Sequence, residues 1–152
     1  MIRTRPAFLL VAFFTLAASP QDIWGQDRPE VPSLLREIRD EVLGLPRYPG
    51  ESFARGEFFL GEGDDDTYKT HAVGVLVNDE AEGSRLTIVV SRLEPARENP
   101  RVKHAREPRT IACRIAGETV EMLRSDYAPP ELEKLLPLVL KAIVDKKSLL
   151  KK

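Results

Sequence analysis

The feature that most constrains this fold is a run of five strand-like segments between two amphipathic helical segments. The first helix is predicted over Pro32–Leu43, because apolar residues recur there at helical spacing and Gly44 followed by Pro46 ends the pattern. The five strand-like segments are Phe53–Leu60, Tyr68–Val77, Arg85–Leu93, Thr110–Ile115 and Glu118–Arg124. Short connections between most of these segments favour an antiparallel meander.

The second helical segment closes the chain and contains a proline within its apolar pattern. Apolar residues recur at helical spacing from Leu132 to Val144. Because Pro137 lacks an N–H and interrupts this pattern, we expect one helical turn from about Pro130 and a longer helix that begins at Pro137. The apolar stripes of both helices need a sheet face to cover. The sequence therefore predicts an α+β fold with an N-terminal helix, an antiparallel meander sheet of about five strands, and a C-terminal helix packed on one sheet face.

The N-terminus has the pattern of a secretory signal peptide. Arg3 and Arg5 precede the apolar run Ala7–Ala18, and small and polar residues follow it. Twelve residues form a helix of about 18 Å, which is too short to cross a hydrocarbon core of about 30 Å, so no stable membrane span is expected. No Cys lies near the processing zone, which argues against a lipoprotein. We therefore predict a signal peptide over residues 1–25 and a single α+β domain over residues 26–152. The mature protein is expected to be exported, periplasmic or secreted, and soluble.

The charge balance and the cysteine count exclude some classes of function and one means of stabilising the fold. The whole chain has 23 Lys and Arg and 24 Asp and Glu, and residues 1–25 contain two Arg and one Asp, so the mature domain keeps 21 basic and 23 acidic residues. A net charge near −2 argues against a general nucleic-acid binder. The single cysteine, Cys113, excludes an intramolecular disulfide, so the core alone must stabilise the fold. The oligomeric state stays open.

Candidate metal ligands are few and poorly spaced. The acidic segment Glu62–Asp66 lacks the alternating ligands and the final Glu of an EF-hand calcium loop. His71, His104 and Cys113 form no close pair of the kind that zinc sites use, and Cys113 alternates with apolar residues as a buried side chain does. No metal and no cofactor are therefore expected.

The segment Glu94–Arg109 departs most from the expected pattern. Sixteen residues with three prolines are predicted to form a long loop between strands. Its basic residues are suited to contacts with carboxylates or phosphates, and the candidate binding residues are Arg97, Arg101, Lys103 and Arg106. A solvated loop of mixed charge is the alternative. The segment contains no aromatic residue, which argues against stacking on single-stranded nucleic acid.

Three functional hypotheses follow. The first is an exported, non-catalytic domain that binds a protein or an anionic ligand through its sheet and the segment Glu94–Arg109. The second is a small enzyme that uses His71 or His104 with nearby carboxylates, although carboxylate pairs such as Glu57 with Glu121 can be chosen freely. The third is a structural subunit of an envelope complex, which predicts a large exposed apolar patch.

Overall fold

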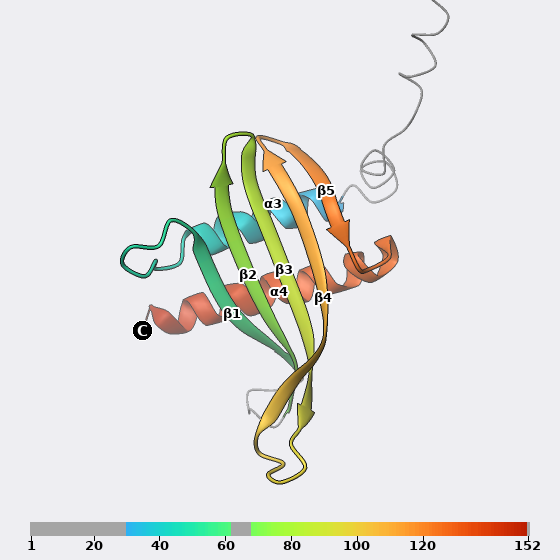
Figure 1. Ribbon diagram of the computed structural model, residues 1–152. Helices are drawn as coiled ribbons and strands as arrows, with labels where there is room; N and C mark the ends of the chain where they lie inside the picture. Colours follow the sequence, from blue (N-terminus) through green and yellow to red (C-terminus); the bar gives the residue numbers. More distant parts are fainter. Residues whose placement is uncertain (1–29, 62–67, 152) are drawn as a thin grey trace, which may run out of the picture.

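The computed structural model describes residues 30–61 and 68–151, in the order helix, five strands, helix. The elements are α3 (Glu30–Leu43), β1 (Ala54–Gly61), β2 (Lys69–Glu80), β3 (Gly83–Pro95), β4 (Lys103–Ala116), β5 (Thr119–Ser125) and α4 (Pro129–Leu150) (Figure 1). This architecture confirms the predicted α+β fold. The predicted signal peptide and the acidic segment Glu62–Asp66 lie outside the described residues.

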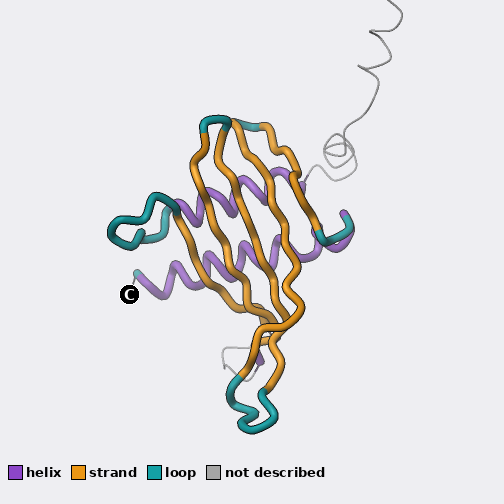
Figure 2. Tube along the Cα trace, viewed as in Figure 1, coloured by secondary structure: helices purple, strands orange, loops and turns teal. Residues whose placement is uncertain are grey.

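The five strands form one antiparallel sheet in chain order, β1-β2-β3-β4-β5 (Figure 2). Both helices lie on the same face of this sheet (Figure 1). Alternation along each strand sends apolar side chains toward the helices, as the burial of Val73, Val75 and Val77 on β2 illustrates. We call the opposite face of the sheet, which neither α3 nor α4 covers, the open face.

The core between sheet and helices is apolar throughout the described residues. Helix α3 contributes four buried side chains, Val31, Leu35, Ile38 and Val42. Helix α4 contributes four more, Leu132, Leu136, Val139 and Ile143. No polar or charged residue of the described chain is buried in this core, so the fold is stabilised mainly by removal of apolar surface from water.

Helix α4 differs from its predicted form, because it is continuous from Pro129 to Leu150 and contains Pro137 in its interior. Pro137 is exposed, whereas Leu136 and Val139 beside it are fully buried. The predicted restart at Pro137 is therefore wrong. Tertiary packing of the apolar face holds the helix together across a position where one backbone hydrogen bond cannot form.

The prediction of a long loop over Glu94–Arg109 is also wrong, because most of this segment forms a β-hairpin. Strand β3 continues to Pro95, β4 begins at Lys103, and only residues 96–102 connect them. The hairpin extends beyond the rest of the sheet (Figure 1). Its three prolines lie at a strand end, in the connection, and beside Glu107, where the register shifts and φ is +53°. These are positions where a strand tolerates the loss of an N–H donor.

Candidate functional site

The predicted binding residues lie on the part of the β3–β4 hairpin that spans residues 92–107, which we call the basic hairpin. It carries five Lys and Arg and three Glu. Arg97 and Arg101 lie exposed in its connection, Lys103 begins β4, and Arg106 lies three residues further along that strand. The structure thus places the four residues on one protruding element without bringing them into a single cluster.

Some of the basic side chains of the hairpin form ion pairs or hydrogen bonds within the chain. Arg92 forms ion pairs with Glu94 and with Glu107, the second at 3.3 Å, and Arg106 Nε lies 3.9 Å from Glu94. Lys103 Nζ donates a hydrogen bond of 2.7 Å to the carbonyl of Lys69 on β2.

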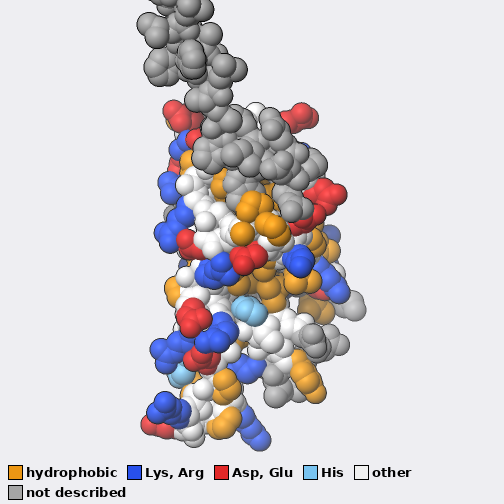
Figure 3. All heavy atoms as spheres, turned by 90° about the vertical axis from the view of Figure 1, so that its right-hand side faces the viewer, with side chains coloured by type: hydrophobic (Ala, Val, Ile, Leu, Met, Phe, Trp, Pro, Cys, Tyr) orange, Lys and Arg blue, Asp and Glu red, His pale blue; other side chains and the backbone are white. Residues whose placement is uncertain are grey.

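At the tip, Arg97 and Arg101 form no ion pair with any carboxylate of the described chain. Asn99 Oδ1 accepts a hydrogen bond from the backbone N–H of Arg101 at 3.1 Å, which shapes the turn, and Arg101 is exposed. Figure 3 shows basic and acidic side chains interspersed toward the hairpin end of the molecule. The two arginines of the tip therefore remain available to an external anion.

A shallow hollow of about 230 Å³ lies on the open face and was missed by sequence reasoning. Its lining comes from three neighbouring strands and consists of Glu57, Phe58, Phe59, Ala72, Val73, Gly74, Val89 and Ser91. The hollow exists because the side chains at its centre are small. Gly74 has no side chain, and no neighbouring atom lies within 4 Å of the position that a Cβ on Gly74 would occupy. The alternation of Ala72 and Gly74 with buried valines was the available signal. Its meaning depends on the register of the neighbouring strands, which local patterns do not specify.

The two histidines lie on different strands. His71 on β2 pairs with Arg92 on β3, and Arg92 pairs with Arg106 on β4. Because β3 lies between β2 and the strand that carries His104, two strand spacings, roughly 10 Å, separate His71 from β4. Thr70 Oγ1 lies 2.9 Å from His71 Nδ1. A proton transfer between the histidines has no geometric support. Within residues 30–61 and 68–151, no group of three His, Cys, Asp or Glu side chains is placed to hold a metal ion.

The carboxylate pair considered for catalysis is also separated. Glu57 lies on β1 and Glu121 on β5, at opposite edges of the sheet. Among the described residues, Glu57 forms no ion pair, whereas Glu121 accepts a hydrogen bond of 3.3 Å from Arg114. This pair therefore offers no shared acid–base site.

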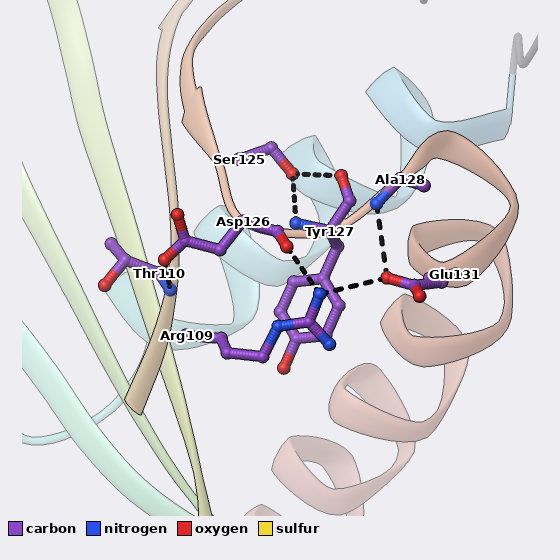
Figure 4. Close-up of polar contacts among 7 residues, drawn as sticks. All are labelled: Arg109, Thr110, Ser125, Asp126, Tyr127, Ala128 and Glu131. Carbon is purple, nitrogen blue, oxygen red and sulfur yellow. Dashed lines mark hydrogen bonds and ion pairs between the residues drawn. The ribbon is translucent and has the colours of Figure 1, made fainter. Parts of the chain in front are cut away.

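A second polar cluster joins β4 to the start of α4 (Figure 4). The guanidinium carbon of Arg109 lies 3.8 Å from the centre of the Tyr127 ring, and its Nη2 lies 3.1 Å from Glu131 Oε2. Arg109 also donates to the carbonyl of Asp126. Glu131 in turn accepts a hydrogen bond of 3.2 Å from the N–H of Ala128, which satisfies a free donor at the helix start. The cluster therefore positions the β5–α4 connection.

Hydrogen bonds and burial shift three pKa values in the described chain. The backbone N–H of Thr110, which lies 2.7 Å from Asp126 Oδ2, and the Arg124 side chain lower the pKa of Asp126. Burial raises the pKa of Tyr127. Cys113 is fully buried, which confirms that this side chain belongs to the core. Burial raises its pKa to about 12, which argues against a reactive thiol.

No helix in the described part of the chain is long and apolar enough to cross a membrane. Comparison of the chain with models of protein families, with curated proteins and with solved structures finds no match.

Proposed function

We propose that this chain is an exported, non-catalytic binding domain, and that its basic hairpin contacts an acidic segment of a protein partner. The observation that carries the proposal is the pair of exposed arginines, Arg97 and Arg101, at the end of a hairpin that extends beyond the sheet. Their guanidinium groups have no ion-pair partner among the described residues. Arginine is suited to bidentate contacts with carboxylates, which an acidic peptide segment supplies.

A protein partner fits this surface better than a nucleic acid does. The hairpin contains no Phe, Tyr or Trp on which a base could stack, and the whole chain has a formal net charge of −1. The ladder between β3 and β4 continues to the pair Pro95–Lys103, so the tip is held out by strand structure rather than by a free loop. A rigid support lowers the entropy cost of binding at the tip.

Export is the second part of the proposal and rests on the sequence pattern of residues 1–25. It is tested by expressing the full chain with a C-terminal tag and separating cytoplasmic from extracytoplasmic fractions. Mass spectrometry of the N-terminal peptide is expected to find a mature chain that begins between residues 18 and 26. A full-length chain retained in the cytoplasm would contradict export and leave the hairpin proposal to its own test.

The hairpin is tested by charge reversal at its tip. We expect Arg97→Glu with Arg101→Glu to weaken binding of a glutamate-rich peptide by on the order of tenfold at low salt. The matched control is Lys134→Glu with Lys141→Glu, which makes the same charge change at exposed positions of α4. In parallel, cross-linked partners are identified in native extracts. Equal effects of the two double variants, or no effect of either, would contradict a role for the tip.

A further inference from the structure

Strand β1 forms a free edge of the sheet. Among the described strands it pairs only with β2. In an antiparallel ladder, alternate residues direct both backbone groups to the same side. The carbonyl of Glu57 accepts a hydrogen bond from the side chain of Lys146 on α4, which indicates that it points away from β2. Arg55, Glu57 and Phe59 therefore present their N–H and C=O groups at this edge.

The residues at this edge are self-complementary around Gly56. Arg55, Glu57 and Phe59 alternate along β1, and their parity places them on the open face, whereas Phe53 lies in the bend directly before β1. When this segment is reversed about Gly56, arginine falls opposite glutamate and phenylalanine falls opposite phenylalanine. Such opposite-charge and aromatic pairs are the contacts that stabilise neighbouring antiparallel strands.

We propose that β1 pairs antiparallel with β1 of a second copy of this chain around a two-fold axis at Gly56. The two five-stranded sheets then form one continuous sheet. Arg55 of each copy lies opposite Glu57 of the other in a pair that exchanges backbone hydrogen bonds. The bend that holds Phe53 of each copy lies opposite Phe59 of the other. Because both copies use the same segment, the interface is closed and cannot extend into a filament.

Exposed apolar side chains on the same side of the molecule as β1 support pairing with a second copy of the chain. Tyr48 is 61 % exposed, Phe59 46 %, Leu149 69 % and Leu150 64 %. The connection that holds Tyr48 and the C-terminal end of α4 both lie on the β1 side of the sheet (Figure 1). A second copy at this edge removes apolar surface from water in addition to pairing the backbone groups.

Two side chains must adjust. Lys146 leaves the carbonyl of Glu57, which then accepts a hydrogen bond from the N–H of Arg55 of the second copy. Arg55 pairs with Glu51 at 3.1 Å within its own chain, and its guanidinium carbon lies 4.9 Å from the centre of the Tyr48 ring. Its side chain is half exposed, so its remaining N–H donors can reach Glu57 of the second copy. The carboxylate of Glu57 has no ion pair in the described chain to give up.

The pairing also completes the hollow on the open face. Glu57 and Phe59 form its β1 side and are open to water in the single copy. In the dimer, Arg55 of the second copy lies beside Glu57, and the bend that holds Phe53 of the second copy lies beside Phe59. The two copies thus contribute residues to each of two symmetry-related hollows.

A charge-swap cycle tests the proposal by sedimentation velocity on the purified mature chain. We expect the wild type to dimerise, and Arg55→Glu or Glu57→Arg to weaken the dimer by on the order of tenfold, since each places like charges opposite each other twice. The double variant Arg55→Glu with Glu57→Arg restores opposite charges and is expected to recover most of the affinity. Circular dichroism checks that each variant is folded.

Hydrogen exchange identifies the edge that is used. The amides of Arg55 and Glu57 are expected to exchange more slowly as protein concentration rises, whereas those of Thr119–Ser125 on β5 keep their rates. A wild type that stays monomeric up to its solubility limit would overturn the proposal. So would a dimer whose affinity the double variant fails to recover, or one without concentration-dependent protection at β1. Hairpin variants leave all these readings unchanged, so this proposal and the proposed function fail separately.

Discussion

Replacing Pro137 with alanine tests why α4 is continuous. Pro137 is the ninth residue of a 22-residue helix, well beyond the first turn where proline costs little. It cannot donate to the carbonyl four residues earlier, and its ring crowds that carbonyl. Host–guest scales place proline about 3 kcal/mol below alanine in a helix interior.

Packing explains why the helix tolerates this cost. Leu132, Leu136, Val139 and Ile143 are fully buried on its inner face. Burial of side chains of this size contributes about 1.5–3 kcal/mol each, so the four together contribute on the order of 6–12 kcal/mol. That sum exceeds the cost of one proline, and a break at Pro137 would uncouple the two halves of the buried stripe.

We therefore expect Pro137→Ala to raise the free energy of unfolding by about 2–3 kcal/mol and Tm by about 10 °C. Pro137 is exposed, so the substitution removes little packing. Urea and thermal unfolding followed by circular dichroism measure the change. Pro137→Gly restores the N–H, but glycine is also a poor helix former. Its increase in the free energy of unfolding should therefore be about 1 kcal/mol smaller than that of Pro137→Ala. Lys141→Ala, at an exposed position one turn later, should have almost no effect. A Pro137→Ala variant no more stable than the wild type would refute the reasoning.

Three further predictions concern the shifted groups and the β5–α4 connection. Cys113 keeps its proton in the fold, where its pKa is about 12, whereas the unfolded thiol titrates near 9. The free energy of unfolding should therefore fall between these pH values by up to about 1.4 kcal/mol per unit in the wild type and less in Cys113→Ala, as urea titrations at each pH will show. Asp126 has a lowered pKa, so its stabilising contribution is present at neutral pH and is lost as pH falls. Asp126→Asn should consequently show a shallower loss of stability in acid, measured from unfolding midpoints between neutral and acidic pH. Arg109→Lys loses the planar stacking on Tyr127 and should destabilise the domain by about 1 kcal/mol in urea unfolding, whereas an unchanged midpoint would show that the cluster in Figure 4 is dispensable.

The order of elements could be predicted from the sequence because local patterns decide it. The alternation of Leu86, Ile88 and Val90 and the helical spacing of Leu35, Ile38 and Val42 each match the face that the structure buries. Short connections then leave the antiparallel meander as the simplest arrangement. These inferences need no knowledge of distant residues.

The errors occurred where tertiary structure overrides a local rule. Pro95 and Pro108 favour a loop, yet one ends β3 and the other lies at a register shift, so strands surround both. The candidate binding residues Arg97, Arg101, Lys103 and Arg106 share one segment of the sequence, but no local pattern in that segment indicates its strand pairing. Contacts such as Lys146 with Glu57, 89 residues apart, carry no local signal at all. The self-complementary pattern around Gly56 is visible in the sequence, and it acquires meaning only when β1 is known to be an edge.

The proposed dimer determines how the two basic hairpins can be used. Antiparallel pairing at Gly56 directs the hairpins toward opposite ends of the joined sheet. Gly56 is level with Ile88 through the register of β1, β2 and β3, and the hairpin tip lies about ten residues further along β3. At roughly 3.3 Å per residue each tip lies about 35 Å from the axis, so the two tips are about 70 Å apart. A partner with one short acidic segment therefore binds one hairpin with the same affinity in monomer and dimer. Only a partner that repeats acidic segments over that distance gains from dimerisation, because its second contact becomes intramolecular.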